Sequence, residues 1–478
     1  MITQRRTKIL ATLGPATDPP GMLERLVAAG MDCARVNCSH GGAEDLLRRA
    51  RGVREASERA GKTLGLLFDL QGPKLRLSGD TAPRELEVGD TVTFTGNGDG
   101  GGEDRVKVDF EGFARLCTAE SEIVIGDGVP RMSVAGVTDT EVRARVISPG
   151  PLSARKGVNV TFARPELPAI TGKDLADLEV ACEAGADFVA LSFVRSAADI
   201  EQLRAQMSEL GCKARVIAKI EKVEAYHDLD AIIAVSDGVM VARGDYGVEA
   251  GVARVPLMQK DTILRATRQG KTVITATQML ESMIQAPEPT RAEVADVANA
   301  VIDGTSAVML SAETSVGRYP VETVQAMATI AEAAEEAPEI HGRARDIVQD
   351  TPAAAIMHAA VDLAHEVDAA AIVIPTSTGG TPRACAKYRP RRPLVVLAHQ
   401  NGVAEQLALE WGVYAARMDH ADTVDELIDS ALDGARDFAG LTPGSKVVIT
   451  AGRAGIPGGT NLIMIREVPE PGARTLTP

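Results

Sequence analysis

Eight short apolar segments, most of them separated by amphipathic stretches of helical period, constrain the fold of this chain more than any other feature. The segments are rich in Val, Ile, Leu and Ala and need not alternate with polar residues, as is typical of strands buried on both faces. Eight such strands with intervening helices predict an α/β fold, a closed (β/α)8 or TIM barrel. The predicted strands are Lys8–Leu13, Cys33–Cys38, Leu64–Asp69, Phe188–Phe193, Ala214–Ile220, Gly238–Ala242, Lys271–Thr275 and Ala307–Ser311.

The spacing between predicted strands has one large exception, which follows the third strand. Residues 74–161 lack helical periodicity, are rich in Gly, Thr and Val, and contain alternating runs such as Thr91–Thr95. A Gly-rich stretch at residues 96–102 predicts a turn. We therefore expect a small all-β domain inserted in a barrel loop, acting as a lid, with a merely structural embellishment as the alternative.

A second α/β pattern follows the eighth strand. Residues 339–478 predict an open-sheet α/β domain, which leaves residues 1–73 and 162–338 for the catalytic barrel. The predicted strands of this third domain are Ala369–Ile374, Pro393–Ala398, Tyr414–Met418, Lys446–Thr450 and Leu462–Glu467.

Composition limits the binding partners that the protein can have and the cellular compartment in which it is expected. The 478 residues carry a net charge of -15, which disfavours binding to nucleic acid or to an anionic membrane surface. Six scattered cysteines without a C-x-x-C motif indicate free thiols and a reducing compartment. Since no run approaches ~18 apolar residues, we expect a soluble cytoplasmic protein without nucleic-acid or membrane partners. An anionic substrate then requires a local cluster of cations and amide groups.

Polar residues close each of the eight apolar runs. Active sites of barrels of this kind lie at the C-terminal ends of the strands, so these residues predict one site at one rim. The alternative is that strands simply end in polar residues. The predicted rim contains three cations and four carboxylates among Thr12, Arg35, Asn37, Ser39, Asp69, Ser192, Lys219, Glu221, Arg243, Asp245, Thr277, Ser311 and Glu313.

The segment around Lys219 is the most specific indication of a functional site among these residues. An ammonium within an apolar strand is partly desolvated, which is costly unless the group faces an anion. Strand alternation places Glu221 on the same face, and Asp245 ends the next strand. Two carboxylates from adjacent strand ends suit Mg²⁺ or Mn²⁺. A structural Lys219–Glu221 ion pair is the alternative, and Gly244 allows a carboxylate to approach the backbone.

Several long motifs resemble those of the pyruvate kinase family, and the resemblance covers nearly the whole chain. It is weakest in the inserted domain and the C-terminal third. The matching stretches are Thr7-Lys-Ile-Leu-Ala-Thr-Leu-Gly-Pro-Ala-Thr, Ala34-Arg-Val-Asn-Cys-Ser-His-Gly, Asp69-Leu-Gln-Gly-Pro-Lys, Lys219-Ile-Glu, Met240-Val-Ala-Arg-Gly-Asp, Thr275-Ala-Thr-Gln-Met-Leu-Glu-Ser-Met and Pro289-Thr-Arg-Ala-Glu-Val-Ala-Asp-Val-Ala-Asn-Ala. The resemblance implies phosphoryl transfer from phosphoenolpyruvate to ADP, giving pyruvate and ATP in glycolysis, usually in a homotetramer with a regulatory C-terminal domain.

The resemblance also implies roles for individual residues. Glu221 and Asp245 would hold the divalent ion, while Lys219 and Arg35 would contact the phosphoryl group in transfer. The other implied substrate residues are Gly244 and Asp245 through their amides, Ser192, and Thr277 near the carbon that is protonated. The implied nucleotide-binding residues are Asn37, His40, Arg76 and Lys156. Because Arg76 and Lys156 flank the inserted domain, lid closure would bring cations to ADP.

One departure concerns the monovalent cation. Relatives that need K⁺ hold it with the positions of Asn37, Ser39, Asp69 and a Thr where this chain has Leu70, and they carry Glu where this chain has Lys74. The stretch Leu70, Gln71 and Lys74 resembles K⁺-independent relatives, in which a tethered ammonium supplies the charge. We therefore expect activity without K⁺. The alternative is that Lys74 faces solvent at a hinge and K⁺ still binds.

The C-terminal domain contains a Thr- and Gly-rich loop before a predicted helix, with Thr381 as N-cap and Pro382 as first residue. It resembles the effector-phosphate loop of allosteric relatives that bind sugar phosphates or AMP. An ordinary turn with a helix cap is the alternative. The expected effector residues are Thr376, Ser377, Thr378 and Thr381.

Two other functions are compatible with the motifs. A lyase or aldolase could form a Schiff base between Lys219 and a keto acid. A non-catalytic sugar-phosphate sensor could be built on an inactivated kinase, but it would be expected to lose Lys219, Glu221, Asp245 or Thr277, and all four are present.

Overall fold

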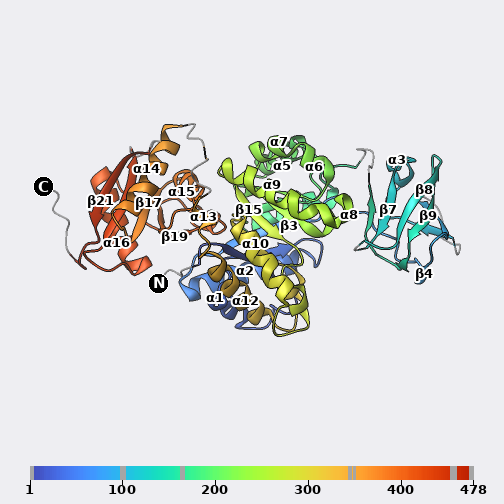
Figure 1. Cartoon of the computed structure of the whole chain (residues 1–478), viewed down its shortest axis with the longest axis horizontal. Helices are drawn as coiled ribbons and strands as arrows, with labels where there is room; N and C mark the ends of the chain where they lie inside the picture. The colour runs from blue at the N-terminus through green and yellow to red at the C-terminus, as the bar shows by residue number, and fades with distance from the viewer. Residues whose placement is uncertain are drawn as a thin grey trace.

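Eight parallel strands close into the central barrel of this computed structural model, with the order β1-β16-β15-β14-β13-β12-β3-β2 around the ring. The inserted β domain lies at one end of the barrel and the C-terminal α/β domain at the other (Figure 1). The structure describes residues 5–96, 104–126, 128–161, 167–342, 347, 351–452 and 460–472. The barrel strands are β1 (Lys8–Thr12), β2 (Cys33–Asn37), β3 (Gly65–Leu70), β12 (Phe188–Leu191), β13 (Arg215–Ile220), β14 (Gly238–Ala242), β15 (Thr272–Ala276) and β16 (Ala307–Leu310).

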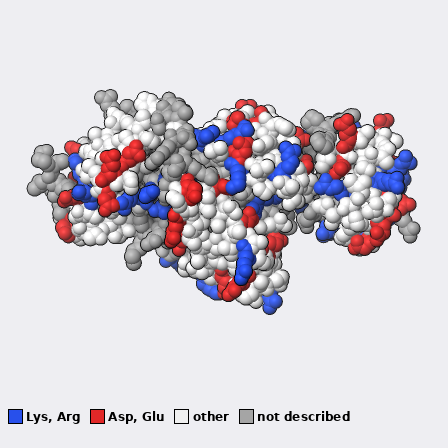
Figure 2. Space-filling model, in the orientation of Figure 1, with Lys and Arg blue, Asp and Glu red and all other residues white. Residues whose placement is uncertain are grey.

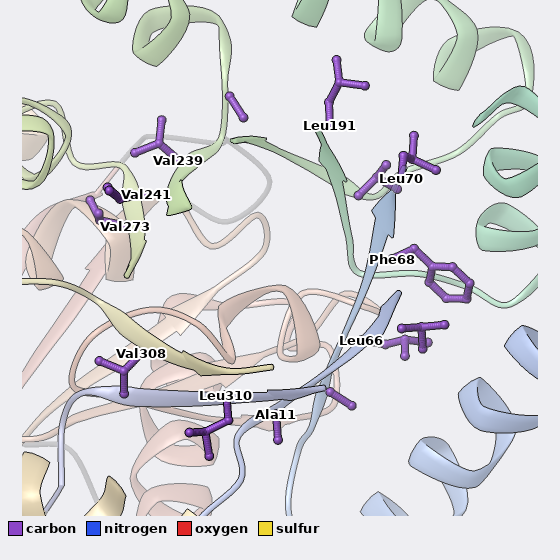
Figure 3. Packing of buried hydrophobic residues seen from close by; sticks show 14 of the residues in the cluster. Ala11, Leu66, Phe68, Leu70, Leu191, Val239, Val241, Val273, Val308 and Leu310 are labelled. Carbon is purple, nitrogen blue, oxygen red and sulfur yellow. The ribbon is translucent and has the colours of Figure 1, made fainter. Parts of the chain in front are cut away.

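Side chains alternate between the two faces of each barrel strand. In β3, Leu66, Phe68 and Leu70 point outward into the core shared with the surrounding helices (Figure 3). Leu67 of the same strand joins a separate cluster inside the barrel, and Asp69 lines the cavity at its mouth. The alternation therefore turns the predicted polar residues inward while the apolar residues hold the helices.

Helices cover the outside of the barrel, and several begin at strong caps. Thr171 with Asp174, and Thr290 with Glu293, form capping boxes, and Pro320 stands in the first turn of α12. The barrel helices are α1 (Met22–Ala29), α2 (Ala43–Ala60), α4 (Gly172–Glu183), α5 (Ala197–Glu209), α6 (Val223–His227), α7 (Leu229–Val235), α8 (Arg243–Ala250), η1 (Val252–Arg254), α9 (Val255–Arg268), η2 (Glu281–Ile284), α10 (Arg291–Ile302), α11 (Ala312–Ser315) and α12 (Pro320–Ala334).

The inserted domain consists almost wholly of strands, as predicted, and has its own core around Phe94 and Phe113. Its sheets have the orders β11-β7-β8-β9-β5-β6 and β10-β4, and one short helix, α3 (Phe113–Leu116), was not predicted. Residues 97–102 of the turn predicted at 96–102, and the predicted boundary at residue 162, lie outside the described residues. The strands are β4 (Arg84–Leu86), β5 (Thr91–Thr95), β6 (Arg105–Lys107), β7 (Glu122–Ile125), β8 (Arg131–Val137), β9 (Glu141–Ser148), β10 (Gly150–Leu152) and β11 (Val158–Val160).

The C-terminal domain is an open five-stranded sheet of order β19-β18-β17-β20-β21, with β21 antiparallel at the edge. Met357 of α14 and Cys385 of α15 belong to one core cluster of this domain, and Leu432 of α16 belongs to another. The elements are α13 (Glu339–Gly342), α14 (Pro352–Glu366), β17 (Ala371–Thr376), α15 (Gly380–Ala386), β18 (Leu394–Ala398), η4 (Glu405–Leu407), β19 (Val413–Arg417), α16 (Val424–Ala439), β20 (Lys446–Gly452) and β21 (Thr460–Glu467).

The predicted start of α15 is wrong. The helix begins at Gly380, after Gly379, whose φ of 76° lies in the left-handed region that favours glycine. Thr381 is therefore the second helical residue and not the N-cap. The hydroxyl of Thr376 accepts a hydrogen bond from the Gly379 N–H at 3.0 Å, and the Thr381 hydroxyl contacts that of Thr460 at 2.8 Å. The left-handed glycine lets the chain turn earlier than the Thr-Pro signal predicts.

Acidic and basic side chains are interspersed over the face drawn in Figure 2. The negative net charge is therefore not gathered there into one acidic surface. Among the described residues, no helix combines the length and the apolar character needed to cross a bilayer.

Candidate active site

A cavity of about 590 Å³ opens at the C-terminal ends of the barrel strands. Its lining comes from strands that are far apart in the sequence, as the barrel prediction requires. The predicted residues that line it are Thr12, Arg35, Asn37, Ser39, His40, Asp69, Gln71, Lys74, Arg76, Ser192, Lys219, Glu221, Asp245, Thr277 and Ser311.

The Lys219 ammonium lies at the centre of a buried polar cluster. Its Nζ is 2.9 Å from Glu221 Oε1 and 3.3 Å from Asp69 Oδ1, and it donates to Ser192 Oγ at 2.7 Å. Burial alone would lower the pKa of Lys219, but Asp69 and Glu221 outweigh it and the pKa lies above its ordinary value. Lys219 therefore stays a cation at neutral pH.

Asp69 joins two cations from different strands. Its Oδ2 is 2.7 Å from Arg35 Nε, and Arg35 also donates to Thr12 Oγ1 at 3.0 Å. Burial would raise the pKa of Asp69, but Lys219 and Arg35 hold it below its ordinary value. This carboxylate, which the sequence predicts at a monovalent-cation position, is already paired with protein cations.

Glu221 and Asp245 present carboxylates to the same cavity. Glu221 Oε2 accepts a hydrogen bond from the Phe193 N–H at 2.7 Å. Burial raises the pKa of Glu221, Lys219 opposes that shift, and Asp245 adds to it. A cation bound between the two carboxylates would therefore stabilise the ionised form of Glu221.

A hard divalent ion fits this donor set. Among the described residues, no three or more His, Cys, Asp or Glu side chains are placed to hold a metal ion. The two carboxylates Glu221 and Asp245 would therefore need substrate oxygens and water to complete a shell, which is how Mg²⁺ is commonly held.

Thr277 is held in an unusual backbone conformation directly after β15. Its φ is 76° and that of Gln278 is 55°, both in the left-handed region that non-glycine residues rarely adopt. Arg243 supports the turn by donating from Nη2 to the Thr277 carbonyl at 2.7 Å, while its Nη1 binds Asp296 at 2.7 Å. Gly244 packs so closely that an added Cβ would lie 2.9 Å from Thr277 Cγ2.

Two predicted rim residues do not line the cavity. Arg243 is used to support Thr277, as described above. Glu313 is fully buried and accepts hydrogen bonds from the N–H groups of Ser311 and Leu280, at 2.6 and 3.3 Å. The expectation that all three cations and four carboxylates converge on the cavity is therefore wrong for Arg243 and Glu313. Their side chains form hydrogen bonds with backbone groups outside the lining.

The predicted nucleotide residues are only partly brought together. Asn37, His40 and Arg76 line the cavity, and burial together with Arg76 lowers the pKa of His40. Lys156 is exposed and does not line the cavity, although its neighbour Gly157 pairs with Arg76.

Sequence reasoning missed Asp45 and Arg49, which also line the cavity. Both lie in α2, four residues apart, so that helical spacing places them on one face. Arg49 binds Asp18 Oδ2 at 3.0 Å. The available signal was the position of α2 directly after the polar end of β2.

In the loop expected to bind an effector, Thr376 is buried and Thr378 is exposed. The hydroxyls of Thr376 and Thr381 already have partners within the protein, and Ser377 is half-buried. The Thr378 carbonyl accepts a hydrogen bond from Arg383 at 3.1 Å. The loop is thus tied to the helix that follows it.

Fold and site together define a barrel enzyme whose mouth gathers cations and carboxylates around one cavity. Comparison with known proteins agrees with this class. The profile of the pyruvate kinase barrel domain matches residues 4–324, and that of the pyruvate kinase alpha/beta domain matches residues 354–466.

Curated relatives match over nearly the full chain. A pyruvate kinase from Geobacillus stearothermophilus is 41% identical over 97% of this chain and 81% of the relative. One from Mycobacterium tuberculosis is 41% identical over 98% of this chain and 99% of the relative, and one from Bacillus licheniformis is 39% identical over 97% and 80%. The chain belongs to the pyruvate kinase family, whose members are phosphotransferases that use a divalent metal ion.

The contact between Gly244 and Thr277 generates a prediction. Gly244→Ala places a methyl group against Thr277 Cγ2 and should lower kcat/KM for phosphoenolpyruvate at least about tenfold, because Thr277 must move. Gly247→Ala, in the same helix but with 3.7 Å to its nearest neighbours, is the matched control and should be near wild type. Steady-state kinetics measure both.

A double-mutant cycle tests the cause of the loss. Thr277→Ser removes the crowded methyl group, so adding Gly244→Ala in that background should cost much less than in the wild type. Equal losses in the two backgrounds would contradict the contact as the explanation.

Proposed function

We propose that this chain catalyses Mg²⁺-dependent phosphoryl transfer from phosphoenolpyruvate to ADP, giving pyruvate and ATP. The observation that carries the proposal is the Lys219 ammonium held between Asp69 and Glu221 in the cavity that Arg35 and Asp245 also line. Catalysis of phosphoryl transfer is mainly positioning and electrostatic stabilisation, which such a preorganised cluster supplies.

The cations act on the phosphoryl group. Arg35 binds it in the ground state, and Lys219 neutralises the charge that spreads over its oxygens as the bond to the enol oxygen breaks and the bond to ADP forms. Ser192 and Asp69 hold the ammonium in place for this task. Glu221 and Asp245 would hold the divalent cation, which neutralises anionic oxygens of the substrate when bound.

The other groups act on the enolate. The amides of Gly244 and Asp245, at the start of α8, bind the substrate carboxylate, and Thr277 lies beside the carbon that accepts the proton when pyruvate forms. The tight packing of Gly244 on Thr277 supports a fixed distance between these two contacts.

The nucleotide binds between the barrel mouth and the inserted domain. Asn37, His40 and Arg76 line the cavity, and Lys156 reaches ADP when the inserted domain closes as a lid. The antiparallel pairing of Arg76 with Gly157 supports a joint movement of Arg76 and Lys156.

The charge state of Lys219 favours phosphoryl transfer over the Schiff-base alternative. A Schiff base needs a neutral amine, whereas the pKa of Lys219 is raised by its carboxylate partners. Borohydride trapping with pyruvate distinguishes the two functions, since only the Schiff base becomes a stable secondary amine. A non-catalytic sensor would be supported only if the chain made no pyruvate.

The enzyme works without K⁺ in this proposal. Lys74 is exposed and lines the same cavity as Asn37, Ser39 and Asp69, so its ammonium can supply positive charge at the mouth. Leu70 packs outward into the barrel core and provides no hydroxyl.

The C-terminal domain is regulatory and binds a phosphorylated sugar or AMP through the loop of Thr376, Ser377, Thr378 and Thr381. The exposed Thr378 and half-buried Ser377 are the side chains best placed for a phosphate, while Thr376 and Thr381 shape the loop. A binding role for Thr376 or Thr381 would require their present hydrogen bonds to rearrange.

The chain assembles as a homotetramer through two separate uncovered surfaces. One is the open groove between α10 and α12, lined by Val294, Val321 and Ile330, and the other is the edge strand β21 with exposed Ile465. A tetramer of dihedral symmetry needs two different contacts between copies, and these two surfaces would supply them. The free thiols are compatible with a reducing cytoplasm, where we place the protein. The proposal also divides the chain into a catalytic barrel of residues 1–73 and 162–338, an inserted domain of residues 74–161 and a C-terminal domain of residues 339–478.

Removing the central ammonium tests the proposed function. Lys219→Met should lower kcat for pyruvate formation by about 10²- to 10³-fold in a coupled assay with phosphoenolpyruvate, ADP and Mg²⁺, because one preorganised charge is lost. Lys222→Met is the matched control, since that ammonium contacts Glu249 and does not line the cavity. A Lys219→Met enzyme with near-normal kcat would refute the mechanism.

Potassium dependence tests the role of Lys74. In a Na⁺-buffered, Mg²⁺-saturated assay, the wild type should be as active without K⁺ as with it. Lys74→Glu should create a requirement for K⁺, because it removes the tethered cation and adds an anion. Lys446→Glu, an equal charge change on an exposed residue of the C-terminal sheet, should leave activity K⁺-independent. A large stimulation of the wild type by K⁺ would contradict this expectation.

Effector binding is tested on the phosphoenolpyruvate saturation curve. Glucose 6-phosphate, fructose 1,6-bisphosphate and AMP are each added, and at least one should shift the half-saturating concentration. Ser377→Ala with Thr378→Ala should abolish that shift, whereas Ser445→Ala, in a distant turn of the same domain, should retain it. If all three compounds leave the wild-type curve unmoved, the effector role of the loop is wrong.

A further inference from the structure

The bottom of the barrel, at the N-terminal ends of its strands, is joined to the C-terminal domain by a buried segment between η4 and β19. Leu409 is fully buried in the cluster that fills the inside of the barrel, together with Leu10 and Ile274. The next residue, Glu410, is only 4% exposed. A carboxylate at such a depth is costly unless it is paired and hydrogen-bonded.

One oxygen of Glu410 serves both domains. Thr272, the first residue of β15, donates its hydroxyl to Glu410 Oε1 at 2.7 Å. Arg383 of α15 donates from Nε to the same oxygen at 3.1 Å. The start of β15 and the C-terminal domain therefore share a single acceptor atom, and a change at either partner alters the other bond.

Arg383 continues the path to the Thr- and Gly-rich loop. Its Nη1 donates to the Thr378 carbonyl at 3.1 Å, and its Nη2 donates to the Gln406 carbonyl at 3.2 Å. Gly379 lies against the guanidinium so closely that an added Cβ would be 2.7 Å from Nη1. The loop cannot move far without displacing this side chain.

β15 continues the path to the active site. The strand ends at Ala276 and leads directly into Thr277, whose left-handed turn is held by Arg243. β15 pairs with β14 along its whole length but with β16 only at Ile274 and Thr275. Thr272 and Thr277 stand at the two ends of this strand, so an axial shift of β15 would move both of them together.

We propose that Glu410 is a positioning residue that couples the C-terminal domain to the active site through Thr272 and β15. Binding of substrate at Thr277 and rearrangement of the loop at Thr378 then bias the same two-state contact at Glu410 Oε1. The inference rests on the proposed role of Thr277 in binding phosphoenolpyruvate.

The chain carries its own reporter of this contact. Trp411 is the sole tryptophan of the sequence and adjoins Glu410, and the guanidinium groups of Arg6 and Arg389 lie 5.9 and 5.0 Å from its ring centre. Indole emission responds to nearby charges, so a shift of Glu410 should change the fluorescence of the full-length protein.

The test uses Thr272→Val and Glu410→Gln, with Thr323→Val as matched control. Thr323 is also a fully buried threonine, but its hydroxyl donates to the carbonyl of Tyr319, the N-cap residue of α12. In the wild type and the control, phosphoenolpyruvate with Mg²⁺ should change Trp411 emission over the concentration range of KM. In the two test variants, that change should be lost and KM for phosphoenolpyruvate should rise about three- to tenfold, with kcat within about twofold.

A purely structural role would give a different result. It would lower the unfolding temperature while the emission change and KM stay as in the wild type, and that outcome overturns the inference. If phosphoenolpyruvate leaves the Trp411 emission of the wild type unchanged, the inference is overturned as well. If the wild type forms no pyruvate at all, the proposed function itself fails; if it forms pyruvate and the variants match it, only the coupling fails.

Discussion

The paired burial of two cations and two carboxylates at the barrel mouth is the constraint on which the site depends. Arg35, Asp69, Lys219 and Glu221 come from β2, β3, β13 and the residue just after β13, and their side chains are at most 11% exposed. Any one of them left unpaired would cost about 3–5 kcal/mol, so the four stabilise one another only when the strands are in register. The barrel supplies that register through apolar residues on its outer face.

The two ends of the barrel differ in structure and role. At the C-terminal ends of the strands, polar side chains surround an open cavity. At the N-terminal ends, Leu409 completes the apolar cluster and Glu410 ties β15 to the C-terminal domain. Because the packed interior between the two ends is not continuously deformable, a movement at this tie reaches the mouth only if β15 shifts as a unit.

Sequence periodicity was enough to predict the strands, the inward position of Lys219 and Glu221, and their shared cavity, because alternation and strand ends are local properties. It failed where a competing partner decided the outcome. Arg243 and Glu313 satisfy backbone groups, and Gly379 starts α15 before the expected Thr381. Lys156 depends on the placement of the inserted domain, which no local pattern encodes.

The balance of charge at the mouth explains how an acidic protein can hold anionic substrates. The cations that line the cavity are Arg35, Arg49, Lys74, Arg76 and Lys219, and the carboxylates are Asp45, Asp69, Glu221 and Asp245, so the ionised side chains sum to one net positive charge. Within this lining, burial first and Asp245 second raise the pKa of Glu221 against the opposing effect of Lys219, so a divalent cation beside these two carboxylates would add the positive charge that an anionic substrate needs. Affinity for the anion and affinity for the cation are therefore coupled reciprocally, since each ligand supplies the charge that the other requires.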